Sequence, residues 1–140
     1  MIQVISRFYI LAASFITAAA YAQDTAPKYQ LDQKQTSVVQ MSSLSPGSDC
    51  HPARLAGRVI KREFDDSALI VTGVVIEKRD GSRDFVAIDL ELENASMADR
   101  EWLITGLQTL LQEGKQVSLG VKLCGAAGRA VVLDSIRPLP

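Results

Sequence analysis

Histidine, cysteine and aromatic residues are all scarce in this sequence. Its 140 residues include one histidine, two cysteines and 6 per cent aromatic side chains. A single histidine excludes a multi-histidine metal site, and few aromatic rings leave little surface for stacking on bases or sugars. The chain also lacks an excess of charge, with 15 basic and 16 acidic residues. Nucleic-acid binding normally requires a basic surface, so it is not expected here.

The first 22 residues have the pattern of a secretory signal peptide. A basic start ends at Arg7 and is followed by an apolar run over residues 8–20 and by the triplet Ala20-Tyr21-Ala22. An A-x-A triplet after an apolar run predicts cleavage after Ala22, and the run is shorter than the ~20 residues that span a bilayer. We therefore expect an exported protein, periplasmic or secreted, without a stable membrane anchor after cleavage.

Export would place the two cysteines, Cys50 and Cys124, in an oxidising compartment, so we predict a disulfide between them. Two other uses of these residues stay open. Cys50, His51 and Cys124 could hold a metal ion, because thiolate and imidazole both bind zinc and copper. Cys50 could also be a nucleophile with His51 as its base. Neighbouring side chains on an extended backbone point to opposite faces, which argues against that catalytic pair.

Composition divides the rest of the chain into two segments. Residues 23–49 are polar and show no sustained period, so we interpret them as a flexible leader with one short strand at residues 37–41. Residues 50–140 are dense in valine, isoleucine and leucine, with turn signals at regular spacing. This second segment is predicted to form one folded domain.

Five strands and one helix are predicted in that domain. The strands are expected at residues 55–64, 68–77, 84–93, 116–124 and 129–137. The helix lies between the third and fourth strands; Ser96 and Asp99 form an S-x-x-D start signature, a stripe of leucines follows at helical spacing, and Gly114 ends it. The predicted fold is therefore mainly β with one helix.

This order of elements, β-β-β-α-β-β, resembles the OB-fold, a five-stranded Greek-key barrel. The resemblance covers residues 54–137 and depends on the element order alone. It implies that the first and fourth strands are antiparallel neighbours. Cys50, just before the first strand, would then lie close to Cys124, at the end of the fourth, as the predicted disulfide requires.

The second and third strands flank Asp80-Gly81, a strong hairpin signal. We predict the register that places large apolar side chains together on one face, since a slip by one residue would mix them with charged ones. The facing pairs of this predicted core face are Val75 with Val86, Gly73 with Ile88, Val71 with Leu90 and Leu69 with Leu92.

The opposite face of the same hairpin is the predicted functional surface, because OB-folds commonly bind ligands along these two strands. It carries apolar and acidic side chains: Ile70, Thr72, Val74, Ile76, Phe85, Ala87, Asp89 and Glu91. Such an apolar area is normally either covered or used. We expect it to bind another protein or a small ligand; coverage by the leader or by a second copy is the alternative.

These features favour an exported binding or assembly module without catalytic activity or cofactor. The mature chain has few aromatic residues and a slightly acidic charge, so oligosaccharide and nucleic-acid ligands both rank below proteins and small cationic ligands. Two alternatives remain open. One is a small hydrolase or metal-dependent enzyme that uses the acidic row of Asp89, Glu91 and Glu93. The other is a metal-binding protein that uses Cys50, His51 and Cys124.

Overall fold

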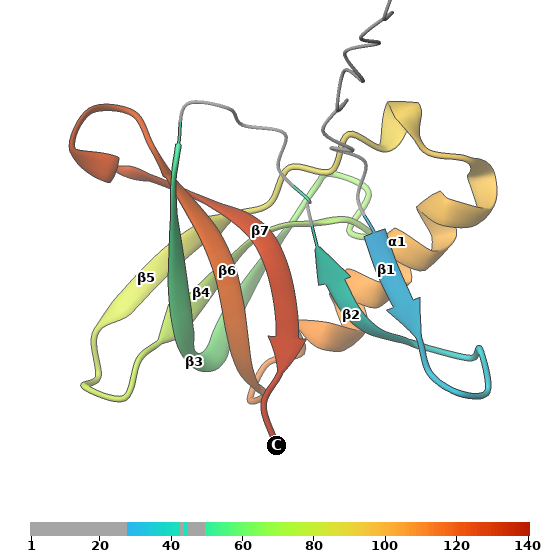
Figure 1. The fold of residues 1–140 in the computed structure, drawn as a ribbon, viewed down its shortest axis with the longest axis horizontal. Helices are drawn as coiled ribbons and strands as arrows, with labels where there is room; N and C mark the ends of the chain where they lie inside the picture. Colours follow the sequence, from blue (N-terminus) through green and yellow to red (C-terminus); the bar gives the residue numbers. More distant parts are fainter. Residues whose placement is uncertain (1–27, 43, 45–49) are drawn as a thin grey trace, which may run out of the picture.

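The computed structural model describes residues 28–42, 44 and 50–140. In this part of the chain, seven strands form one mixed sheet accompanied by one α-helix (Figure 1). The strands are β1 (Lys28–Leu31), β2 (Val38–Ser42), β3 (His51–Phe64), β4 (Val71–Glu77), β5 (Arg83–Ala87), β6 (Gln116–Cys124) and β7 (Ala130–Pro138), and helix α1 (Met97–Leu110) lies between β5 and β6. The predicted signal peptide and its cleavage site lie outside the described residues. No helix among the described residues is long and apolar enough to span a membrane.

Strands β3 to β7 are joined by successive pairings. β3 pairs with β4, β4 with β5, and β6 with both β3 and β7, always antiparallel, whereas β5 and β7 are parallel. The pairing thus runs from β3 through β4, β5, β7 and β6 back to β3. β3 is long enough for both its partners, because residues 51–58 pair with β6 and residues 58–64 pair with β4. The junction of β5 with β7 consists of one residue pair, Ala87 with Val132.

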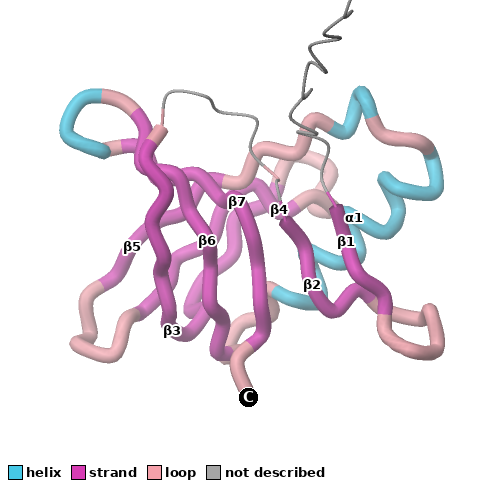
Figure 2. Tube along the Cα trace, in the orientation of Figure 1, coloured by secondary structure: helices cyan, strands magenta, loops and turns pink. Residues whose placement is uncertain are grey.

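β1 and β2 form a hairpin that extends the sheet beyond β7 and lies beside α1 (Figures 1 and 2). We predicted a flexible leader with one short strand here; the structure has two strands, Lys28–Leu31 and Val38–Ser42. Val38 and Met41 are buried in the common core. Strands this short leave little periodicity in the sequence, and contacts with α1 and β7 add to the pairing of β1 with β2 in holding them.

The start of α1 confirms the predicted cap. The Asp99 backbone N–H donates to Ser96 Oγ at 3.1 Å, and Tyr29 of β1 donates its hydroxyl to Asp99 Oδ1 at 2.7 Å. The hydrogen bonds from Ser96 and Tyr29 hold the pKa of Asp99 below its usual value. Further along the helix, Gly106 lets β2 approach closely, because a Cβ atom there would meet Val38 Cβ at 2.9 Å. Contacts at both ends therefore join the hairpin to the helix.

A single core lies between α1 and the strands. The leucine stripe predicted for the helix is part of it, since Leu103, Leu107 and Leu110 are buried. The strands contribute buried side chains mainly from β3 to β7, namely Leu55, Val59, Val71, Val74, Ile76, Val86, Val117, Leu119, Val121, Leu133 and Ile136. The helix thus buries its leucines in the same core as the strands, and lies mainly against β2.

The register of the β4–β5 hairpin differs from the predicted one by one residue. Val86 faces Val74, and Phe85 faces Val75, so the predicted pairing of Val75 with Val86 is wrong. The turn explains the shift: the Lys78 N–H donates to the Ser82 carbonyl at 2.8 Å, and Gly81 adopts a left-handed conformation with φ +83°. This closes a three-residue loop, which moves every facing pair by one position.

Candidate functional site

The weakest junction in the described sheet lies between β5 and β7. Only Ala87 pairs with β7, so the β5 segment before it has no strand partner on that side among the described residues. Phe85 lies in this segment and is 47% exposed, whereas the adjacent Val86 is fully buried. The Phe85 ring covers Gly73 of β4, where a Cβ atom would meet the ring at 2.5 Å. The glycine thus makes room for an exposed aromatic ring beside an open junction.

Two adjoining hollows occupy this junction. The outer hollow, about 460 Å³ in volume, is lined by Arg83, Asp84, Phe85, Ala87, Arg129, Ala130 and Val131. The inner hollow, about 330 Å³, is lined by Ala53, Arg54, Leu55, Lys78, Asp84, Val121, Leu123 and Val131. Asp84 and Val131 line both hollows, so the two adjoin at these residues. We call the two hollows together the seam cleft.

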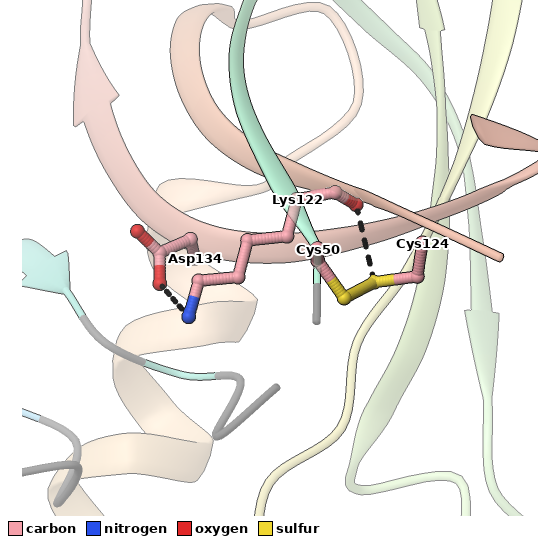
Figure 3. The surroundings of a disulfide bond; sticks show 4 residues. All are labelled: Cys50, Lys122, Cys124 and Asp134. Atoms are coloured by element: carbon pink, nitrogen blue, oxygen red, sulfur yellow. Dashed lines mark hydrogen bonds and ion pairs between the residues drawn. A yellow bond between two sulfur atoms is a disulfide. The ribbon is translucent and has the colours of Figure 1, made fainter. Parts of the chain in front are cut away.

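A disulfide lies beside the inner hollow. Cys50 and Cys124 are bonded, with an S–S distance of 2.03 Å and their Cα atoms 4.5 Å apart, which confirms the predicted bond (Figure 3). It joins the start of β3 to the end of β6, next to the two strand segments that line the inner hollow. Because both sulfurs are in the disulfide, neither is a thiolate. The alternatives that needed a cysteine ligand or nucleophile therefore have no support in this structure.

The charges of the seam cleft are mainly positive. Its lining contains four cationic side chains and one carboxylate: Arg54, Lys78, Arg83 and Arg129, with Asp84. Lys78 Nζ lies 3.0 Å from Asp84 Oδ2, and this hydrogen bond raises the pKa of Lys78. In the part of the chain that the structure describes, neither Arg54 nor Arg129 takes part in an ion pair. An anionic group in the cleft would therefore meet uncompensated guanidinium groups.

A second cluster of charges lies at the turn end of the β4–β5 hairpin, beside the cleft. Arg58 and Arg83 both bind Glu77, at 2.9 Å and 3.3 Å. The hydrogen bond from Arg58, followed by that from Arg83, lowers the pKa of Glu77. Arg83 is thus partly compensated, which leaves Arg54 and Arg129 as the strongest candidates for anion contacts.

The structure places the eight residues of the predicted surface in different environments. Phe85 and Ala87 line the seam cleft, and Thr72 is exposed elsewhere on β4. Val74 and Ile76 are fully buried, so their prediction as surface residues is wrong; the one-residue shift of register turns them into the core. Ile70 is half-buried in the turn before β4.

The predicted acidic row is not on a strand. β5 ends at Ala87; Asp89 and Glu91 follow in irregular backbone, and Glu93 lies in a single 3-10 turn. All three side chains are exposed. Among the described residues, no three histidine, cysteine, aspartate or glutamate side chains are placed to hold a metal ion. The acidic row therefore does not have the geometry of a strand face on which its prediction depended.

Most residues of the cleft were missed because they come from strands far apart in the sequence. Arg54, Leu123 and Arg129 come to the same cleft as Phe85 only through the pairing of β3, β6 and β7 with one another. A partial signal was present: the alternation of residues 116–124 indicated that Val121 and Leu123 face the same side. No local pattern in the sequence indicated the opening between β5 and β7.

Comparisons with known proteins identify no relative of this chain. No protein-family model, no curated protein and no solved structure matched the chain. Its function has to be inferred from the geometry and chemistry of the seam cleft.

Proposed function

We propose that this protein is an exported binding module, without catalytic activity, that holds its ligand in the seam cleft. The observation that carries the proposal is the exposed Phe85 ring beside a hollow at the one-pair junction of β5 and β7. Ligand sites are usually concave and mostly apolar, with a few polar groups at defined positions. The cleft has this composition, with guanidinium groups as its polar part.

We further propose that β3 to β7 form an OB-fold-like barrel. Two observations support it. The pairings of these five strands form a closed series that begins and ends at β3, and α1 lies between the third and fourth of the strands. OB-folds bind ligands along their second and third strands and in adjacent loops. Here those strands are β4 and β5, and the loop before β7 supplies Arg129 to the outer hollow. The barrel interpretation and the cleft therefore agree on the location of the site.

Determination of the N-terminal residue tests the proposed export directly. We expect protein recovered from outside the cytoplasm to begin at Gln23, because the apolar run and the A-x-A triplet place cleavage after Ala22. A disulfide suits an oxidising compartment and supports the same location. Edman degradation or terminal-peptide mass spectrometry measures the start. Protein that begins at Met1 would contradict export by this signal.

The binding proposal can be tested with anilinonaphthalene sulfonate, a small aromatic probe with an apolar body. We expect its titration into ¹⁵N-labelled protein to shift the amide signals of residues 83–87 and 129–131. Phe85→Ser should weaken binding about tenfold, because one aromatic contact is worth about 1 kcal/mol beyond the lost area. Fluorescence titration of both proteins gives the affinities.

Met97→Ser is the matched control, since Met97 is 81% exposed and lies at the start of α1, outside the cleft. It should leave probe binding unchanged. Shifts confined to α1, equal losses in the two variants, or full binding by Phe85→Ser would each contradict a ligand site at the cleft.

A further inference from the structure

The inner hollow is suited to hydrocarbon. Five of its lining residues are apolar, Ala53 and Leu55 from β3, Val121 and Leu123 from β6, and Val131 from β7. Leu55 and Val121 belong to the buried core, and the other three pack against it. Its three charged lining residues are Lys78 and Asp84, which are bonded to each other at 3.0 Å, and Arg54. A ligand segment that enters here finds mainly apolar contacts, and the Arg54 guanidinium is the one charged group of the lining without an ion pair among the described residues.

The outer hollow has a different chemistry. Arg83 and Arg129 lie on either side of the junction, one from β5 and one from the loop before β7. Guanidinium groups bind carboxylates and phosphates through paired hydrogen bonds, and Arg129 has no ion pair among the described residues. This cationic site belongs to a chain whose net charge is −1, so it is not a consequence of overall basicity.

We infer that the ligand of the seam cleft is a single-chain anionic amphiphile, with its apolar tail in the inner hollow and its anionic head group in the outer hollow at Arg129, beside the partly compensated Arg83. The inference rests on the proposed binding function and deepens it by naming the ligand class. The hollows adjoin at Asp84 and Val131, so the proposed ligand would pass these two residues, with its tail on one side of them and its head group on the other.

Two other occupants fit less well. A peptide strand could pair with the open edge of β5 before Ala87, but this pairing would leave the apolar lining of the inner hollow unused. A membrane surface would need an apolar area around the cleft, but Phe85 is the only lining residue among the large exposed apolar side chains of the described chain: Val39, Phe64, Leu69, Phe85, Met97 and Leu139. A single chain of modest length matches a partly open hollow of about 330 Å³ better than either.

The test compares three probes by isothermal titration calorimetry, each below its micellar concentration. Laurate is expected to bind with one molecule per protein. Hexanoate, with the same head group and six fewer methylenes, should bind at least about 100-fold more weakly, because each buried methylene adds to the affinity. Dodecyltrimethylammonium, with the same tail length and a cationic head, should bind at least about tenfold more weakly than laurate.

Two arginine variants test the position of the head group. Arg129→Gln should weaken laurate binding about tenfold, as loss of a charge-assisted hydrogen bond predicts. Arg137→Gln is the matched control, because Arg137 is exposed on β7 and does not line the cleft. Asp84→Asn should tighten laurate binding, since it removes the only carboxylate of the lining. Equal effects of the two arginine variants would overturn the assignment of the head group.

The outcomes separate this inference from the proposed function. If the aromatic probe binds at the cleft and laurate does not, or laurate and the cationic chain bind equally, the amphiphile inference fails and the binding function stands. If neither probe binds at the cleft, both fail. Binding to phosphatidylglycerol vesicles without binding to laurate would assign the site to a membrane surface and also overturn the inference.

Discussion

Replacing Cys50 and Cys124 together by serine is expected to lower the free energy of unfolding by about 4 kcal/mol. The two cysteines are 74 residues apart, and the loop that they close contains β3, β4, β5, α1 and most of β6. A link across so long a loop removes many conformations from the unfolded chain, and chain-entropy models convert that loss into stability of this size. Stabilities of small domains are about 5–15 kcal/mol, so the change is a large fraction of the total.

Urea unfolding of the oxidised protein and of the double-serine variant measures this difference. Oxidised protein treated with reductant is the control, and it should unfold at the same urea concentration as the variant, because both lack the same link. Intact mass with and without reductant should differ by two hydrogens. A loss below about 1 kcal/mol in the double variant would contradict stabilisation through loop closure.

Local features of the fold were predictable because local chemistry produces them. The cap formed by Ser96 and Asp99 and the leucine stripe of α1 were correctly predicted, as was the strand over residues 116–124. Each depends on side chains within a few residues of one another. The disulfide was predicted from compartment and from element order, and its geometry is as expected.

The error in the hairpin register shows which signal was given too little weight. The predicted register placed Lys78 opposite Arg83 and Glu77 opposite Asp84, two contacts between like charges. In the structure Glu77 binds Arg83 at 3.3 Å and Lys78 binds Asp84 at 3.0 Å. The apolar pattern favoured the predicted register, but valines occupy both faces of β4 near Val74 and Val75, so the preference was weak. The charge pairs were the feature that distinguished the two registers.

The seam cleft could not be predicted in the same way. It exists because β5 meets β7 through one residue pair only, a property of the three-dimensional path of five strands. Arg54 and Arg129 are 75 positions apart in the numbering, and no pattern along the chain brings them near Phe85. The β1–β2 hairpin was incompletely predicted for a related reason, because its order depends on contacts with α1 and β7.

Val86→Ser is expected to destabilise the domain by about 3 kcal/mol or more. Val86 is fully buried and faces Val74, which is also fully buried. The substitution removes two methyl groups from a packed core and places a hydroxyl group where the described neighbours are apolar. Loss of packing and burial of a polar group each cost about 1–3 kcal/mol. We expect a large shift of the urea midpoint, or failure to fold at 37 °C.

Phe85→Ser changes the adjacent residue on the opposite face, so the two variants together distinguish core from surface. Phe85 is 47% exposed, and its ring contacts Gly73, so we expect a loss of about 1 kcal/mol or less. Urea unfolding of both variants under the same conditions gives the comparison, and circular dichroism establishes that Phe85→Ser is folded. A loss in Phe85→Ser as large as that in Val86→Ser would place the ring in the core and remove it as a ligand contact. A small loss combined with weakened probe binding means that the exposed ring contributes to recognition rather than to stability.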